Sequence, residues 1–167
     1  MKKIEPIDTI AMLMWSNEET MPKEKVVSDE EIIKDLDNVE DLKQKDCYDR
    51  TYLMCAVIYK RVKVLEYLLN KGANPNEQDE NGFTALHFAV QENSPDIVEI
   101  LLKHKADVCL SDRFGNCALM RGRLNTSPEI FKLLLKYGAD PQQKNIAGVC
   151  AMDVYVASPE IMSVLKN

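Results

Sequence analysis

The chain has 167 residues, of which 46% are hydrophobic and 29% charged, and its formal net charge is −6. This composition is typical of a soluble globular protein and excludes bulk disorder or a collagenous repeat. No apolar run approaches the roughly 18 residues that a membrane helix requires, and the residues after Met1 do not resemble an export signal. We therefore expect a cytoplasmic protein without a membrane segment.

The cysteines and the charge narrow the class of partner. An odd number of cysteines without any C-x-x-C pair fits neither a disulfide framework nor a structural zinc site, so we expect reduced thiols. An acidic protein is poorly suited to neutralise the phosphates of DNA or RNA. The sequence therefore favours a protein partner, with no cofactor, no metal and no direct contact with nucleic acid. The five cysteines are Cys47, Cys55, Cys109, Cys117 and Cys150.

An internal repeat with a period of 33 residues organises most of the chain. A turn residue recurs at this interval, a glycine follows it in the same phase, and a leucine pair recurs later in the unit. The turn residues are Asp46, Asp79, Asp112 and Asn145, the glycines are Gly82, Gly115 and Gly148, and the pairs are Leu68-Leu69, Leu101-Leu102 and Leu134-Leu135.

Each unit is predicted to be a turn followed by two short helices. In the second unit, Gly82 can adopt a positive φ at little cost, and apolar residues then recur at helical spacing. Ser94-Pro95-Asp96 predicts the start of the next helix, because serine can cap free amides, proline suits the first helical position and aspartate suits the positive end of the helix dipole. One unit cannot bury its apolar face alone, so the units must stack into a solenoid.

Residues 84–89 read T-A-L-H-F-A and resemble the T-P-L-H-x-A signature of the ankyrin repeat family, departing only at the proline. The resemblance covers residues 46–167. It implies an all-α ankyrin-repeat solenoid with repeats at 46–78, 79–111 and 112–144 and a truncated C-terminal capping repeat at 145–167. It also implies that His87 is structural and hydrogen-bonds the turn, while Gly82, Gly115 and Gly148 shape the turns.

Residues 1–45 form a different part of the chain, with 7 basic and 12 acidic residues and a net charge of −5. We expect an N-terminal helical cap that includes a degenerate half-repeat. Ser28 and Glu31 form a capping-box pattern at the start of one helix. An earlier helix is expected to carry Ile4, Ile7, Ala11 and Met14 on one face.

The sequence offers little support for catalysis. Its two histidines are His87, at the signature position, and His104, and none of the common phosphate-binding, zinc-protease or serine-hydrolase motifs occurs. Cys117 and Cys150 take the repeat position of Thr51 and Thr84, which explains them as small packed side chains. We predict a protein that is not an enzyme.

The third unit departs from the pattern at 119–123, where Arg121, Gly122 and Arg123 replace residues that favour a buried helix. Such a departure can mark a functional site. Alternatively, both arginines extend from a half-exposed helix surface. Residues 112–144 carry 6 basic and 3 acidic residues, which favours an acidic counterpart.

The resemblance further implies that partners dock on the turn tips and on the concave face of the first helices. Aromatic and arginine side chains, which dominate many interfaces, recur at these positions. The predicted protein-binding residues are Tyr48, Arg50, Glu80, Asn81, Phe83, Arg113, Phe114, Asn116 and Ile146 at the tips, and Tyr59, Gln91, Arg121, Arg123 and Leu124 on the first helices.

Three roles remain open at this point. The leading hypothesis is a binding module that inhibits or neutralises a protein, as bacterial immunity proteins do to toxins, with the acidic N-terminal part steering a basic partner. A second is an inhibitor of a signalling or transcription factor. From another class, an adapter or self-assembling subunit would use an apolar end formed by Met162, Val164 and Leu165, although we expect the free protein to be a monomer.

Overall fold

The computed structural model describes residues 27–39, 41–122, 126–155 and 157–166. Within these ranges the regular elements are helices, accompanied by two isolated antiparallel bridges, Lys45–Thr51 and Ser111–Cys117. The predicted all-α class is confirmed. The elements are α2 (Asp29–Leu36), α3 (Tyr52–Ile58), α4 (Val62–Asn70), α5 (Ala85–Gln91), α6 (Pro95–Lys103), η2 (Ala118–Arg121), α7 (Pro128–Lys136), α8 (Ala151–Val154) and α9 (Pro159–Leu165).

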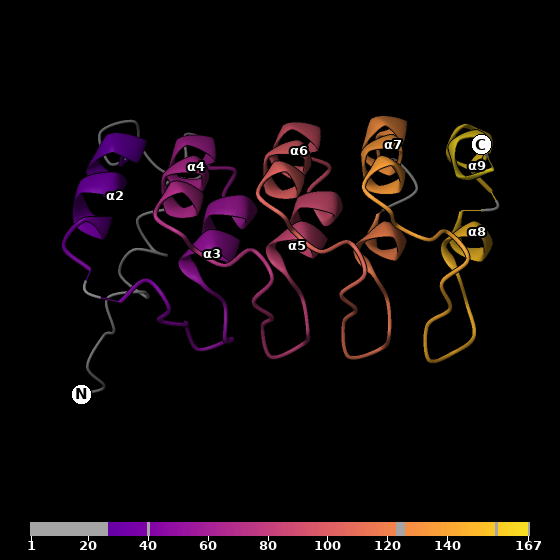
Figure 1. Ribbon diagram of the computed structural model, residues 1–167, viewed down its shortest axis with the longest axis horizontal. Coiled ribbons are helices and arrows are strands. Elements are labelled where there is room, and N and C mark those ends of the chain that lie inside the picture. The colour runs from indigo at the N-terminus through magenta and orange to yellow at the C-terminus, as the bar shows by residue number, and fades with distance from the viewer. Residues whose placement is uncertain (1–26, 40, 123–125, 156, 167) are drawn as a thin grey trace.

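The helices form two rows along a solenoid (Figure 1). Helices α2, α4, α6, α7 and α9 occupy one row, whereas α3, α5, η2 and α8 occupy the other, and the turn loops project from one edge. The core runs continuously between the rows, with Leu53, Leu86 and Leu119 all buried at the same repeat position. Each unit therefore buries its apolar face against its neighbours, as stacking requires.

The second helices of the last three units begin with proline at the first helical position, as predicted. The capping role expected of the preceding serines is confirmed only at Ser127, whose hydroxyl accepts from the Glu129 N–H at 3.3 Å. The Ser94 and Ser158 side chains make no capping bond. The Ser94 hydroxyl instead donates to the Glu92 carbonyl, so it is turned away from the helix.

The repeat places a potential capping residue just before each first helix. Thr84 Oγ1 accepts from the His87 N–H, which provides the missing partner of one first-turn amide. In the fourth unit this arrangement is rebuilt from other residues, because Asp153 accepts from the N–H and the thiol of Cys150. The Cys117 side chain makes no capping bond at the start of η2.

The third unit lacks the full first helix expected of each unit. It contains the 3₁₀ turn η2 of four residues, whereas α3 and α5 have seven, and the chain leaves the turn at Gly122 in an extended conformation. Gly122 and Tyr155 occupy the repeat position that Ala56 and Ala89 hold earlier. The Tyr155 hydroxyl reaches back to the Gly122 carbonyl, so the large side chain of the fourth unit occupies space freed in the third.

Helix α2 lies in the row of second helices and packs on α4. The predicted capping box is confirmed, since Ser28 and Glu31 exchange hydrogen bonds. Ile32 and Leu36 are buried in the core, and ion pairs join Asp29 to Arg61 and Glu30 to Lys63. The helix predicted around 4–14 lies outside the described residues. Among the helices described, none has the length and apolar content needed to cross a membrane.

Candidate protein-binding surface

Each turn is built on one side-chain oxygen. Asp79 Oδ1 accepts from the backbone N–H groups of Asn81 at 2.9 Å and Phe83 at 2.7 Å, and the Asp79 N–H donates to the Phe83 carbonyl. Gly82 lies inside this loop with a φ of +81°. The same bonds recur around Asp46, Asp112 and Asn145. Each turn is therefore a closed, preformed loop.

Hydrogen bonds also join one turn to the next. The N–H groups of Glu80, Arg113 and Ile146 donate to the carbonyls of Tyr48, Asn81 and Phe114, at distances of 3.0–3.3 Å. A Cβ at Gly82 would lie 2.9 Å from the backbone nitrogen of Arg113, so the close approach of successive turns requires glycine there. The turn tips thus form one continuous, rigid edge.

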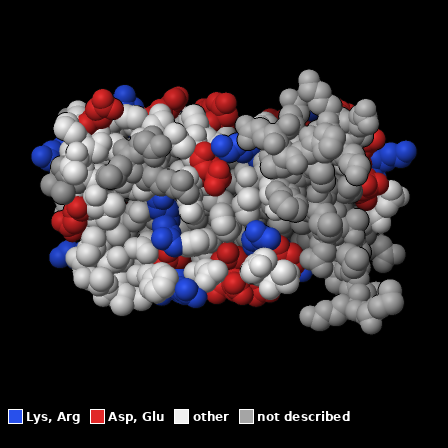
Figure 2. Space-filling view, turned by 180° about the vertical axis from the view of Figure 1, so that it is seen from behind, with Lys and Arg blue, Asp and Glu red and all other residues white. Residues whose placement is uncertain are grey.

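Apolar side chains extend from this edge into solvent. Tyr48 is 53% exposed, Phe114 is 52% exposed and Ile146 is 80% exposed. The exposed Arg113 stacks its guanidinium on the Phe114 ring, 4.8 Å from the ring centroid. Along the lower edge of Figure 2, where the turn loops lie, basic and acidic side chains lie among uncharged ones. We call Tyr48, Arg113, Phe114 and Ile146 the turn-tip surface.

Two residues predicted to face a partner are held within the molecule. Arg121 Nη2 lies 2.9 Å from Asp112 Oδ2, and the guanidinium carbon lies 4.2 Å from the centre of the Phe83 ring. Phe83 is half-buried and also contacts the rings of His87 and Phe88. The pair therefore joins the second unit to the third, which accounts for an arginine within η2.

The other predicted residues differ in their exposure and in their side-chain partners. Arg50 is half-buried and forms an ion pair with Asp46, in which its Nε and Nη2 both contact Oδ2. Asn116 bonds to Asp112 and accepts from Asn145. Glu80 is exposed, whereas Asn81, Tyr59 and Gln91 are half-buried, and Arg123 and Leu124 lie outside the described residues.

His87 is buried and links two units. The Thr84 N–H donates to His87 Nδ1 at 3.2 Å, so the ring donates from Nε2 to the Asn116 carbonyl, which lies 3.1 Å away. Burial lowers the pKa of His87, and it outweighs the opposing effect of the bond to Asn116. The neutral histidine thus performs the structural role that was predicted. Among the described residues, no group of three potential metal ligands occurs.

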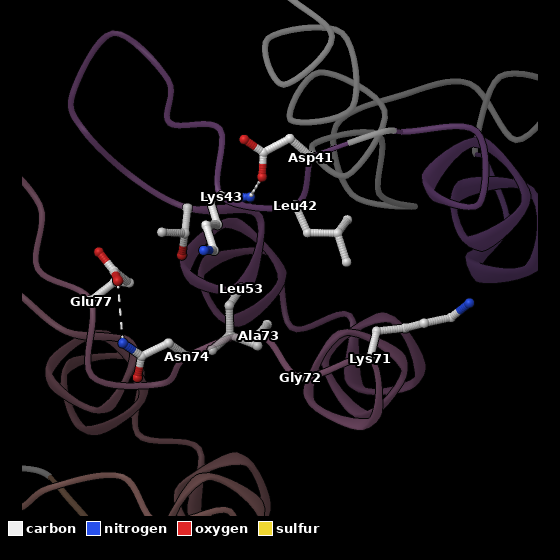
Figure 3. A pocket seen from close by; sticks show the side chains of 10 residues that line it. Asp41, Leu42, Lys43, Leu53, Lys71, Gly72, Ala73, Asn74 and Glu77 are labelled. Atoms are coloured by element: carbon white, nitrogen blue, oxygen red, sulfur yellow. Dashed lines mark hydrogen bonds between the residues drawn. The ribbon is translucent and has the colours of Figure 1, made fainter.

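A hollow that the sequence did not predict lies near the N-terminal end of the stack, beside the first repeat (Figure 3). It has a volume of about 450 Å³ and separates residues 41–43 from the loop after α4. One feature of the sequence could have indicated this hollow. Lys43 lies at the repeat position where the next unit has Asn76.

The fold and its repeated turns define a class of protein, and two family comparisons agree with it. The family described as ankyrin repeats in three copies matches residues 71–145, and the single ankyrin repeat matches residues 48–80. The chain belongs to the ankyrin repeat family. Repeats of this family are non-catalytic modules for protein–protein interaction.

Two curated proteins share part of the repeat region. Over 54 residues the chain is 41% identical to human transient receptor potential cation channel subfamily A member 1. The matched segment is 32% of this chain and 5% of the channel. Over 45 residues it is 47% identical to an ankyrin repeat protein of Acanthamoeba polyphaga mimivirus, covering 27% of this chain and 11% of the viral protein. The matches span small parts of both relatives.

Proposed function

We propose that this protein binds a protein partner through the turn-tip surface and blocks the partner surface that it covers. The observation that supports this most is the exposure of Tyr48, Phe114 and Ile146 on turns already fixed by hydrogen bonds. Large apolar side chains on a rigid framework lose little conformational freedom on binding, so more of their contact energy contributes to affinity.

Charge gives the surface a preference. Arg113 is exposed beside Phe114, and its guanidinium makes no ion pair among the described residues. An acidic side chain of the partner can pair with it while an adjacent apolar group contacts the ring. Glu80 on the neighbouring turn sets the register by repelling a misplaced acidic group. The partner is therefore expected to present a carboxylate next to an apolar residue.

The test replaces Tyr48, Phe114 and Ile146 together by serine and compares the proteins captured from native lysate. We expect the partner to be lost while circular dichroism and thermal unfolding stay close to wild type, because the three side chains are exposed. The matched control replaces Val62 and Tyr137, which are exposed on second helices, and retains the partner. Capture that survives the tip variant but not the control would place the interface on the second helices instead.

Three finer roles belong to this proposal. Inhibition is the leading one and requires that binding abolish an activity of the purified partner. An immunity role is supported by the net charge of −5 over residues 1–45, and a neighbouring toxin gene would be expected. Inhibition of a signalling or transcription factor is the alternative, separated by the identity of the captured partner. The exposed free thiols of Cys47 and Cys109 support a reducing, cytoplasmic location.

Self-assembly is less well supported than the sequence suggested. Leu165, expected in an exposed apolar patch, is buried, and Met162 and Val164 are half-buried. We propose that the free protein is a monomer and does not act as a self-assembling scaffold. Light scattering over a range of concentrations tests this, because growth in mass would restore the scaffold hypothesis.

A further inference from the structure

The hollow of Figure 3 lies where the cap meets the first repeat. Leu42, Leu53 and Ala73 supply apolar side chains and Lys43 supplies a positive charge, whereas the amine of Lys71 is ion-paired with Asp37. Its volume of about 450 Å³ is in the range of small-ligand sites. The remaining lining residues are Asp41, Thr51, Gly72, Asn74 and Glu77.

One wall of the hollow is a loop that recurs in the next unit with the same backbone. Gly72 and Lys105 both adopt a left-handed conformation, with φ of +88° and +66°. The N–H of the residue that follows each of them donates to a carbonyl five residues earlier, at 3.0 Å in both loops. The carbonyl of Gly72 and the N–H of Asn74 therefore correspond to the carbonyl of Lys105 and the N–H of Asp107.

In the second copy of this loop a side-chain amide binds both groups. Asn76 Nδ2 donates to the Lys105 carbonyl at 3.2 Å, and Asn76 Oδ1 accepts from the Asp107 N–H at 2.8 Å. One primary carboxamide thus joins two successive units by bonding a carbonyl and an N–H two residues apart.

In the first copy the carboxamide is missing. Lys43 lies 33 residues before Asn76, and its side chain has no acceptor atom for the N–H of Asn74. Within the residues that the structure describes, no hydrogen bond reaches the Gly72 carbonyl or the Asn74 backbone N–H. Gly72 and Asn74 both line the hollow, so the loop retains a carboxamide-binding edge that the described part of the chain does not fill.

We propose that this hollow binds a primary carboxamide carried on a short apolar group. A carboxamide presents an N–H and a carbonyl oxygen on the same edge, as Asn76 does. A carboxylate or ketone cannot donate to the Gly72 carbonyl, and a trans secondary amide directs its N–H and its oxygen to opposite sides. The apolar group contacts Leu42, Leu53 and Ala73. This site is separate from the turn-tip surface and goes beyond the proposed function.

The first test fills the site from within the chain. Lys43→Asn supplies the carboxamide that the next unit already uses, so we expect it to raise the midpoint of thermal unfolding by about 2–4 °C. The matched control is Cys109→Asn, because Cys109 holds the same position before a third copy of the loop at Gly138 and Asp140. A rise for Cys109→Asn without one for Lys43→Asn would overturn the proposal.

The second test uses isovaleramide as the probe and follows backbone amide signals of the full chain by NMR. We expect the amides of Gly72, Ala73 and Asn74 to shift, with a dissociation constant of about a millimolar, as suits so small a ligand. The Lys43→Asn variant loses these shifts, whereas Cys109→Asn retains them. No shift at these amides in the wild type would overturn the proposal.

Two close analogues of the probe separate its chemistry from charge and shape. Isovalerate lacks the donor but is attracted by Lys43, and 4-methyl-2-pentanone retains the shape and the oxygen alone. We expect both to shift the three amides at least tenfold less at equal concentration. Equal shifts with isovalerate would reassign the hollow to anions, and equal shifts with the ketone would reduce it to an apolar site, so either result overturns the proposal.

The carboxamide can belong to a free small molecule or to a glutamine of a partner polypeptide. A glutamine-containing hexapeptide that binds more tightly than isovaleramide assigns it to a polypeptide, and weaker binding assigns it to a small molecule. The variant with serine at Tyr48, Phe114 and Ile146 retains probe binding if the hollow acts alone. Failure of the turn-tip surface and failure of the hollow are therefore separable.

Discussion

The hydroxyl of Tyr155 donates a hydrogen bond of 2.5 Å to the carbonyl of Gly122, which lies 33 residues earlier at the same repeat position. The tyrosine ring is buried and meets Phe131 edge-on, with the ring centroids 4.9 Å apart. The first and second units have Ala56 and Ala89 at this position. The third unit has a glycine there, without a side chain, and the fourth unit has a tyrosine, with a large one. The bond also satisfies a carbonyl that the shortened first helix leaves free.

Gly122→Ala tests the space in this pairing. The added Cβ would lie 2.9 Å from both Phe131 Cζ and Tyr155 Oη, so we expect a loss of about 1–3 kcal/mol in the free energy of unfolding, measured with urea. In a Tyr155→Phe background the hydroxyl is absent and the cost falls. Strict additivity of the two substitutions would show that the residues do not share this space.

Tyr155→Phe tests the bond itself. The variant leaves the carbonyl of the half-buried Gly122 without its donor, and a loss of about 1–3 kcal/mol is expected in urea unfolding. Burial raises the pKa of Tyr155, so in the wild type the unfolded chain ionises first as the pH rises, and stability declines above the ordinary tyrosine pKa. The variant should show a smaller alkaline decline, because burial also raises the pKa of Tyr59 and of Tyr67, which remain. An unchanged alkaline profile would count against the buried neutral hydroxyl.

His87→Met tests the origin of acid sensitivity near neutral pH. Methionine occupies the same position in the first and third units, as Met54 and Met120, so the helix can accept it. Burial lowers the pKa of His87, which means that the unfolded chain takes up a proton first as the pH falls below the ordinary histidine pKa. Wild-type stability should decline there, and the variant should be less stable above that pH but show a flatter profile.

An equal dependence of stability on pH in the wild type and the variant would contradict this role of His87. Thermal unfolding measured in steps from neutral to mildly acidic pH would then show parallel curves for both proteins.

Asp112→Asn tests the ion pair that holds Arg121 against Phe83 of the second unit. Asn145 already builds the same turn in the fourth unit, so the turn should survive while the ion pair to Arg121 is lost. We expect a loss of about 1–3 kcal/mol in the free energy of unfolding, because the half-buried guanidinium loses its carboxylate. Urea unfolding at neutral pH measures it, and no loss would mean that Arg121 is stabilised by Phe83 alone.

The same substitution should alter the response to acid. Burial alone would raise the pKa of Asp112, but hydrogen bonds from Asn116 and Phe114 and the charge of Arg121 outweigh it, so the pKa lies below its ordinary value. The stabilisation is therefore present above the ordinary carboxyl pKa and is lost as the pH falls through the lowered one. Asp112→Asn should lose less stability than the wild type over that acidic range.

The sequence predicted the family and the helical solenoid because their determinants are local and repeated. Gly82 and its equivalents show where each turn lies, and the prolines show where the second helices begin. A pattern present four times identifies the fold even where one copy is altered. The third first helix escaped prediction because its length depends on Tyr155, which lies one unit away in space and 33 residues away in sequence.

The site was only partly predictable for a related reason. The phase of the repeat placed Tyr48 and Phe114 on the turn tips, where the structure also has them. The phase did not reveal that Arg121 turns back to Asp112, because that contact joins side chains of adjacent elements. The hollow beside Lys43 depends on which atoms a substituted residue lacks, which becomes visible only when two copies of the loop are compared.

The shortened first helices make the stack uneven along its length. Helices α3 and α5 have seven residues each, whereas η2 and α8 have four each, so the last two units are joined chiefly through α7 and α9. In a linear array each unit contacts only its neighbours, so a unit with a shortened helix can open locally without carrying the others with it. On warming, the amides of η2 and α8 should therefore exchange with deuterated water before those of α3 and α5.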